Sequence, residues 1–266
     1  MKAALVYADA HESPECDRCF EPRFREIRSQ IASHFLVETI ARSALSDSLD
    51  GFDIVFCAGG DGTLLGTAHF LRDTPLCGIR LFPERSVGFL CACDYSDILA
   101  FIEAFFEGRI QPRAHVRLDC LVDGVSLGVP FLNDVLLAHQ CPARASRYEI
   151  AFCGVSQRQC SSGVWVATPL GSHGGLHSAG GAMPDDPDSF AFCVRECARA
   201  SGCDAPLRTA VFSSSSDALT LTTLGDDMCL FGDGGIFVRR VTYGQVLTFR
   251  RHEAALRLFG SLKTSA

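Results

Sequence analysis

Short apolar runs alternate with amphipathic stretches through the first hundred residues of the chain. Runs of the length of buried strands occupy residues 3–8, 35–40, 53–57 and 76–79. Apolar residues at helical spacing follow at 24–33, from 64 to about 72, and at 97–107. The stretch 10–22, with Pro14 and Pro22, is predicted to be a loop. Strands that alternate with helices predict a doubly wound parallel sheet, in which ligands bind at the carboxyl ends of the strands.

The pattern changes after Gly108, where strands follow one another with few helices between them. Strands are predicted at 116–122, 125–137, 147–152, 164–167, 219–224, 228–231 and 235–241. Phe190, Val194 and Cys197 predict one amphipathic helix at 189–200. We therefore expect an α/β N-terminal domain with a doubly wound parallel sheet, residues 1–110, with 250–266 packing back on it. A mainly β C-terminal domain, residues 111–249, is expected to follow.

One glycine-rich stretch, from Phe56 to Leu65, organises the first domain. The apolar run 54–57 stops at Gly59-Gly60-Asp61-Gly62-Thr63, and an apolar period resumes at Leu64. A strand, a glycine turn and a helix N-terminus form a natural binding site for phosphate, because free amides and the helix dipole favour an anion. Phosphate repels the carboxylate of Asp61, so Asp61 needs another task. It could accept a proton from an attacking hydroxyl, help to hold a metal-nucleotide, or simply cap the helix.

Composition and charge narrow the class of partner. The 266 residues are 47% hydrophobic and 21% charged, as in an ordinary soluble protein, and the net charge of −7 disfavours nucleic acid and anionic membranes. No apolar run approaches the roughly 20 residues of a membrane helix, so we expect a cytoplasmic protein. Cys16 and Cys19 have zinc-like spacing, but His11 is the only further ligand candidate nearby. We expect no tightly bound metal.

Three more polar spots interrupt apolar surroundings. Asn133-Asp134 lies within an apolar run; the two side chains could grip a diol such as a ribose, or mark a turn. The segment 168–181 is rich in glycine, histidine and serine, and is compatible with a loop wrapped round a ligand or with a plain flexible loop. Asp233-Gly234 by itself predicts a hairpin turn.

Taken together and in order, these spots resemble the NAD kinase family. Gly59 to Thr63 matches the family's GGDGT motif, Val87-Gly88-Phe89-Leu90 resembles its LGF-type segment, and Asn133-Asp134 is similar to its Asn-Glu pair. Residues 162–181 resemble its DG…TPTGSTAY…SAGG segment, and Asp233-Gly234 its late Asp-Gly turn. GGDGT alone is weak evidence because other kinases carry it, whereas the ordered set covers most of the chain.

The resemblance implies an NAD+ kinase, a phosphotransferase that uses ATP and Mg²⁺ to phosphorylate the 2′-hydroxyl of the adenosine ribose of NAD, giving NADP. Asp61 would be the catalytic proton acceptor, and the glycine amides with the Mg²⁺ brought by ATP would neutralise charge in a loose transition state. The family is commonly homodimeric or homotetrameric. The NAD- and ATP-binding residues that the resemblance implies are Gly59, Gly60, Gly62, Thr63, Leu65, Phe89, Asn133, Asp134, Arg144, Arg147, Ser162, Thr168, His173, Gly174, Gly175, Ser178 and Asp233.

Within that set the resemblance gives some residues particular tasks. Gly62 and Leu65 would lie against the NAD, and Phe89 would pack near its adenine. Asn133 and Asp134 would hold ribose hydroxyls. Either Arg144 or Arg147 would meet the pyrophosphate. Residues 173–178 would surround the adenine and nicotinamide ends.

The chain departs from the family pattern at three places. Ser162 replaces an Asp, His173-Gly174-Gly175 replaces Thr-Ala-Tyr, and Asp134 is one methylene shorter than the usual Glu. These changes affect substrate contacts and leave Asp61 in place.

Two rival functions stay open. A GGDGT-type lipid kinase usually carries Asn-Glu directly after the motif, whereas Leu64-Leu65-Gly66-Thr67 follows here. A non-catalytic sensor of NAD or NADP would keep the fold and lose turnover. An assay for NADP formation separates both from an NAD kinase.

Overall fold

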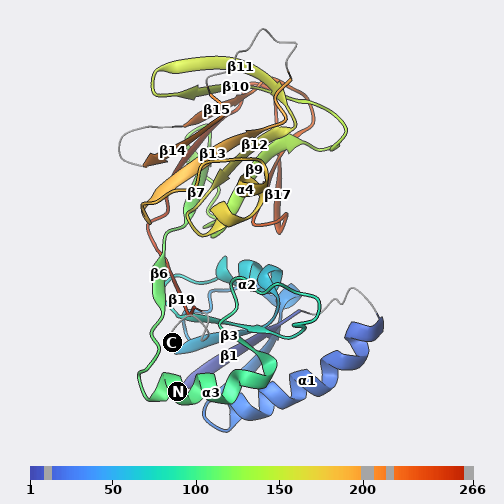
Figure 1. Ribbon diagram of the computed structural model, residues 1–266, viewed down its shortest axis with the longest axis vertical. Helices are drawn as coiled ribbons and strands as arrows, with labels where there is room; N and C mark the ends of the chain where they lie inside the picture. The colour runs from blue at the N-terminus through green and yellow to red at the C-terminus, as the bar shows by residue number, and fades with distance from the viewer. Residues whose placement is uncertain (9–13, 199–206, 214–218, 261–266) are drawn as a thin grey trace. The chain divides into compact units, whose positions relative to one another are not determined.

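The computed structural model describes residues 1–8, 14–198, 207–213 and 219–260, and for residues 14–18 the backbone alone. The chain divides into two compact units. Unit 1 comprises Met1–His115 and Ala254–Ala266, and unit 2 comprises Val116–Glu253. Figure 1 shows the helices and strands of both units.

Unit 1 is built on a largely parallel sheet, as the alternating pattern predicts. Its described strands run in the order β2-β1-β3-β4-β19-β6, and β5 pairs with β4. The strands are β1 (Lys2–Tyr7), β2 (Leu36–Ala41), β3 (Ile54–Gly59), β4 (Leu76–Arg80), β5 (Cys93–Asp94), β6 (Arg113–His115) and β19 (Leu256–Leu258). The segment β19 pairs with β4 and β6, so residues from the far end of the chain complete this sheet; residues 261–266 lie outside the described part.

The helices cover both faces of the unit 1 sheet (Figure 1). They are α1 (Pro14–Ala32), α2 (Asp61–Ala68) and α3 (Ile98–Phe106), with short 3-10 turns η1 (Arg42–Ala44) and η2 (Tyr95–Asp97). Ile27 and Ile31 of α1 share one core with Phe101 of α3 and with Leu5 and Phe56 of the sheet. The helix α2 lies on the opposite face, so every residue of β3 is buried.

The predicted loop at 10–22 is wrong from Pro14 onward, where α1 begins; residues 10–13 lie outside the described part. Pro14 fits the first helical position, but Pro22 lies inside the helix and removes a backbone hydrogen bond. Phe20 and Phe24 stack at 5.1 Å between ring centroids, and both contact Tyr7 of β1. Burial of this continuous apolar face offsets the cost of the internal proline.

The helix after the glycine turn also differs from the prediction. We expected it to start near Leu64 and run to about Arg72, but α2 begins at Asp61 and ends at Ala68. The first turn of α2 is made of the motif itself, which carries no apolar period and therefore gives no helical signal.

Unit 2 is a sandwich of two antiparallel sheets, which confirms the mainly β character. In the described residues one sheet has the order β11-β10-β15-β18-β7-β8 and the other β14-β13-β12-β9-β16-β17. Its strands are β7 (Leu118–Val122), β8 (Val125–Ser126), β9 (Asp134–His139), β10 (Ser146–Phe152), β11 (Val155–Ser161), β12 (Gly163–Ala167), β13 (Ser189–Arg195), β14 (Thr209–Ser213), β15 (Thr220–Thr223), β16 (Met228–Gly232), β17 (Phe237–Val241) and β18 (Val246–Arg251). Side chains from the inner faces of both sheets form one core.

The predicted helix at 189–200 is wrong over its described part, because Ser189–Arg195 is the strand β13. Phe190, Phe192 and Val194 enter the sandwich core, whereas Ala191 and Cys193 pack on the other face with Leu176. Since both faces are covered, the strand shows no polar alternation, and its apolar spacing imitates a helix.

The outer covering of β13 is a short helical segment, η3 (Gly171–His173) followed by α4 (Gly175–Ser178). No helix in the described ranges is long and apolar enough to cross a membrane. Of the possible zinc ligands, Cys19 is free and exposed, and the side chains of His11 and Cys16 lie outside the described part.

Candidate active site

The glycine turn lies at the carboxyl end of β3, between β1 and β4 of the parallel sheet. Gly60 is extended (φ −130, ψ −167) and precedes the first turn of α2. A Cβ on Gly59 would approach Thr63 Oγ1 at 2.2 Å, and one on Gly60 would approach Ser86 Oγ at 2.8 Å, so neither position has room for a side chain. No atom lies within 4 Å of the position that a Cβ on Gly62 would take. The turn is therefore tightly packed on one side and open at Gly62.

Asp61 begins α2 and is half-buried. Its Oδ2 accepts a hydrogen bond from the Phe89 amide at 3.1 Å, and its Oδ1 accepts one from the Leu90 amide at 2.8 Å. The two amide donors fix the orientation of the carboxylate. Asp61 is thus a half-buried carboxylate in a fixed orientation, beside the backbone amides of a helix N-terminus.

The segment that holds Asp61 is itself fixed by Arg80, which sequence reasoning missed. The Arg80 guanidinium donates to the carbonyl oxygens of Ser86 at 3.2 Å and Val87 at 2.9 Å. It also forms two bonds with Asp94, at 2.6 and 2.9 Å, which raise the pKa of Arg80. Gly88 has a φ of +62, and a Cβ there would lie 2.4 Å from Arg80 Cδ. Asp94 and Arg80 therefore position the amides that hold Asp61.

Apolar and thiol groups complete the surroundings of Asp61. The side chains of Val87 and Phe89 are 82% and 56% exposed, so an apolar surface beside the carboxylate is available to a flat ring. Thr63 and Leu65 are buried on α2. Burial and the negative charge of Asp61 raise the pKa of the Cys91 thiol.

In unit 2 the predicted Asn133-Asp134 pair lies where β9 begins, and the side chains meet: Asn133 Nδ2 donates to Asp134 Oδ2 at 3.1 Å. The buried hydroxyl of Thr168, just after β12, donates to the Leu132 carbonyl at 2.7 Å and accepts from the Gly171 amide at 3.0 Å. The ends of β9 and β12 are thereby tied to the loop that follows.

Asp233 belongs to the same cluster as Asn133 and Asp134. It is fully buried in the turn after β16, with a φ of +48. Its carboxylate accepts the amides of Leu132 (3.0 Å), Asn133 (2.7 Å) and Asp134 (3.2 Å). The resemblance implied a ligand contact for Asp233. Its oxygens accept hydrogen bonds from the backbone of residues 132–134, so Asp233 fixes the position of the Asn133-Asp134 pair.

The loop 171–178 approaches the pair through glycines. A Cβ on Gly171 would lie 1.9 Å from the Asn133 carbonyl oxygen, and one on Gly174 would lie 3.7 Å from Asn133 Nδ2 and 3.8 Å from Asp134 Oδ2. Gly175 lies against Trp165, where a Cβ would come within 2.6 Å of the ring. His173 and Ser178 are exposed. Glycine at 171 thus permits the close approach that brings the loop over the polar pair.

Asp134 is the electrostatic anomaly of the cluster. It is only 3% exposed, and its Oδ1 has no hydrogen-bonding partner in the described structure. Burial, and next the charge of Asp233, raise the pKa of Asp134 to about 7, and the Gly234 amide offsets part of that shift.

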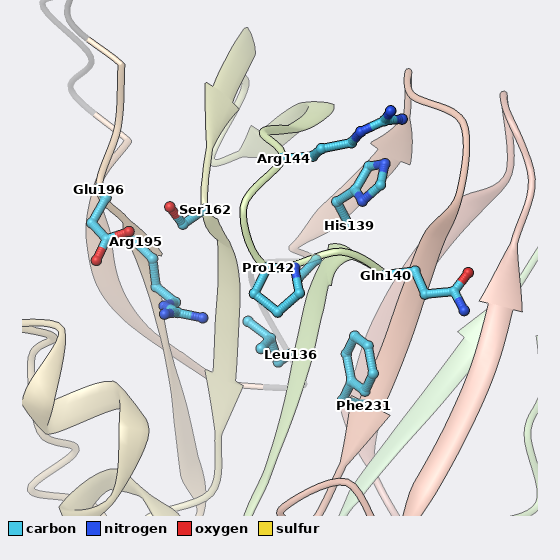
Figure 2. A pocket seen from close by; sticks show the side chains of 10 residues that line it. Leu136, His139, Gln140, Pro142, Arg144, Ser162, Arg195, Glu196 and Phe231 are labelled. Atoms are coloured by element: carbon cyan, nitrogen blue, oxygen red, sulfur yellow. The ribbon is translucent and has the colours of Figure 1, made fainter.

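Arg144, Arg147 and Ser162 do not join the Asp134 cluster within unit 2. Arg144 and Ser162 line a pocket of about 290 Å³, together with Leu136, Ala138, His139, Gln140, Pro142, Arg195, Glu196 and Phe231 (Figure 2). The pairing of Asp134 with Ala167 and of Leu137 with Val164 places this pocket at the other end of β9 and β12. The lining of the pocket on β9 begins at Leu136, two residues after Asp134, and continues to His139 at the end of the strand. Arg147 is exposed on β10.

No family model matches the chain, but comparison with known proteins finds similar kinases. The probable NADH kinase of Oryza sativa subsp. japonica is 29% identical over 232 residues, which cover 79% of this chain and 71% of the relative. The NAD kinase of Clostridium beijerinckii is 31% identical over 168 residues, which cover 61% of this chain and 56% of that relative. The chain is therefore similar in sequence to NAD kinases and NADH kinases.

Solved structures of NAD kinases share the fold. An NAD kinase from Archaeoglobus fulgidus in complex with ATP aligns with a TM-score of 0.69 at 22% identity, over 99% of this chain and 95% of the other. Yeast NADH kinase complexed with NADH aligns with a TM-score of 0.77 at 15% identity, over 100% of this chain and 85% of the other. These likenesses confirm the predicted fold class of a parallel α/β unit followed by a mainly β unit.

Proposed function

We propose that the protein transfers the γ-phosphoryl group of ATP to the 2′-hydroxyl of the adenosine ribose of NAD, giving NADP. The observation that carries this proposal is the Asp61 carboxylate, held by two amides at the first turn of α2. A fixed carboxylate beside a helix N-terminus cannot bind phosphate, but it can accept the proton of a hydroxyl that attacks phosphate. The names of the rice and clostridial relatives agree with this reaction.

In this proposal Asp61 takes the proton from the 2′-hydroxyl as its oxygen attacks the γ-phosphorus and ADP leaves. The open side of Gly62 and the free amides of the first turn of α2 face the phosphates, with Gly59 and Gly60 fixing the turn. A loose transition state needs mainly positioning and neutralisation of charge, and a positioned base contributes about 10²–10⁴-fold. Leu65 and the exposed ring of Phe89 supply apolar contact to the dinucleotide.

We propose that Mg²⁺ arrives as part of the ATP substrate. Among the described residues, no group of three or more His, Cys, Asp or Glu side chains could hold a metal ion. In this proposal the phosphate oxygens of ATP would hold the ion, because Mg²⁺ commonly binds through substrate phosphates.

Unit 2 supplies the proposed grip on the dinucleotide. Asn133 and Asp134 hold ribose hydroxyls, Asp233 and Thr168 fix their backbone, and His173, Gly174, Gly175 and Ser178 lie along the ligand. Arg144 and Ser162 lie in the pocket at the far end of β9, and Arg147 is exposed on β10, so their proposed contact with NAD stays a prediction. The homodimer or homotetramer that the resemblance implies also stays a prediction, to be checked by sedimentation velocity.

The test is product formation. Purified protein is incubated with ATP-Mg²⁺ and either NAD or NADH, and NADP or NADPH is measured with a coupled dehydrogenase. We expect product from the wild type and none detectable from Asp61→Asn. The control Asp47→Asn changes an exposed carboxylate of unit 1 and should retain wild-type activity. Tight NAD binding without product in the wild type would overturn the proposal in favour of a non-catalytic sensor.

A further inference from the structure

We propose that Asp134 carries a proton when the site is free and releases it when a ribose diol binds, so that unit 2 takes up its ligand in exchange for a proton. The inference rests on the proposed function, because it takes the ligand of the Asn133-Asp134 pair to be a nucleotide with a free vicinal diol. Its basis is a pair of buried acids that differ sharply in their hydrogen bonds.

Asp233 is the satisfied member of that pair. Three backbone amides donate to its two oxygens at 2.7–3.2 Å, although the residue is fully buried. These hydrogen bonds replace the water that the two oxygens lose on burial.

Asp134 is the unsatisfied member. Its Oδ2 accepts one hydrogen bond, from Asn133, and its buried Oδ1 accepts none in the described structure. When this carboxylate is ionised, its Oδ1 lacks both water and a hydrogen-bond donor, the Gly234 amide compensates only in part, and the charge of Asp233 opposes ionisation further. Two neighbouring carboxylates cannot both ionise freely, so the proton resides on the one with fewer donors. Burial accordingly raises the pKa of Asp134 to about 7.

Among the residues that the structure describes, the groups that act on Asp134 carry no positive charge that would favour its ionised form. The turn after β16 contributes Asp233, the end of β12 contributes the neutral Thr168, and Asn133 adjoins it on the chain. The loop 171–178 contributes Gly174, whose missing side chain leaves space beside both Asn133 Nδ2 and Asp134 Oδ2. The titratable neighbours on that loop, His173 and His177, are exposed. Asp233 is therefore the charged group that acts on Asp134.

A vicinal diol supplies what the carboxylate lacks. Its hydroxyls can donate to Asp134 Oδ2, beside the space that Gly174 leaves, and an ionised carboxylate is a much stronger acceptor than the carboxylic acid. Binding then breaks the O–H bond of Asp134, sends the proton to solvent, and replaces it with hydrogen bonds from the ligand. The energetic consequence is linkage: affinity for the diol falls about tenfold for each pH unit below the pKa of the free site.

Calorimetric titration of NAD into the full-length protein tests this directly. Titrations at pH 6 and pH 8.5, in buffers with different ionisation enthalpies, give the number of protons released per NAD. We expect close to one proton released at pH 6, very few at pH 8.5, and a dissociation constant about tenfold larger at pH 6 than at pH 7.5. Proton uptake on NAD binding, which has the opposite sign, would overturn the inference.

Variants assign the proton to its residue. Asp134→Asn should bind NAD more weakly, release no proton and lose the pH dependence, whereas the exposed-site control Asp188→Asn should match the wild type. Asp134→Glu carries a longer carboxylate that reaches beyond the buried position, and should shift the dependence to lower pH. A carbonyl band of a protonated carboxyl group in the infrared difference spectrum, lost in Asp134→Asn, would give the same answer from the free protein.

The outcomes separate this inference from the proposed function. Proton release that persists in Asp134→Asn, or NAD binding without any release at pH 6, overturns the inference even if NADP is made. NAD binding with proton release but no NADP supports the inference while the proposed function fails. Absence of NAD binding overturns both.

Discussion

Asp61 in unit 1 and Asp134 in unit 2 are both acids at a strand end, yet the protein treats them in opposite ways. Asp61 is half-buried, and two amides satisfy its two oxygens. Asp134 is almost fully buried, with one oxygen left without a partner. In the proposed reaction the satisfied carboxylate of Asp61 works as a base, whereas the unsatisfied carboxylate of Asp134 gains donors from its ligand. The residue type alone therefore does not define the role; the local donors do.

The difference in hydrogen bonding between Asp61 and Asp134 should have its largest effect on the free energy of unfolding. Asp134→Asn removes a group whose pKa rises from 3.8 to about 7 on folding, and ionisation of that group costs about 4 kcal/mol of unfolding free energy above pH 7. Because folding raises the pKa of this acid, the wild type has its full free energy of unfolding below about pH 4, and part of it is lost as the pH rises to 7. As the pH rises from 5 to 8, the free energy of unfolding of Asp134→Asn should therefore increase by about 3 kcal/mol relative to that of the wild type.

Urea unfolding measures this gain, followed by the fluorescence of Trp165, which is the single tryptophan of the chain and lies in unit 2. Asp188→Asn, an exposed acid of the same unit, should show no such trend. Equal stability of Asp134→Asn and wild type at both pH values would show that Asp134 is not strained in its charged form.

The close approach of the loop over the Asn133-Asp134 pair predicts the next effect. Gly171→Ala would place a methyl group 1.9 Å from the Asn133 carbonyl oxygen, which is backbone and cannot move aside cheaply. We expect a loss of about 3 kcal/mol in the stability of unit 2, read from Trp165 fluorescence, and weaker NAD binding. The matched control Gly225→Ala meets its nearest atom at 3.6 Å and should change stability little. Similar losses in both variants would argue against a packed loop.

The smallest effect tests the support of Asp61. Gly88→Ala combines a φ of +62 with a contact of 2.4 Å to Arg80 Cδ, so it should displace the amides of residues 89 and 90. We expect a loss of about 1–2 kcal/mol in the stability of unit 1 and a fall in kcat of about tenfold, measured by the NADP assay. Gly51→Ala, with open space around it, is the control. Unchanged kcat in Gly88→Ala would show that these amides do not tune the base.

The sequence predicts the parts of the protein that depend on local chemistry. The glycine turn after β3, the Asn133-Asp134 pair and the alternation of strands and helices in unit 1 are all visible as patterns. They are visible because close backbone approach and hydrophobic period are properties of a few neighbouring residues.

Features set by tertiary contacts were not predictable in the same way. Pro22 argued against a helix that is stabilised by Phe20 and Phe24 packing on Tyr7. The strand β13 imitated a helix because both of its faces are covered. The bonds of Asp233 to Leu132, Asn133 and Asp134 span about one hundred residues of sequence, so their existence needed the fold.

The central claim is that Asp61 and Asp134 have different roles. It is tested most directly by measuring NAD affinity and single-turnover NADP formation for Asp61→Asn and Asp134→Asn at pH 8. Asp61→Asn should bind NAD within about threefold of wild type and form NADP at least about 10²-fold more slowly. Asp134→Asn should bind NAD more weakly but, once saturated, turn over near the wild-type rate. Wild-type turnover by Asp61→Asn, or a loss of turnover with unchanged affinity in Asp134→Asn, would contradict these roles.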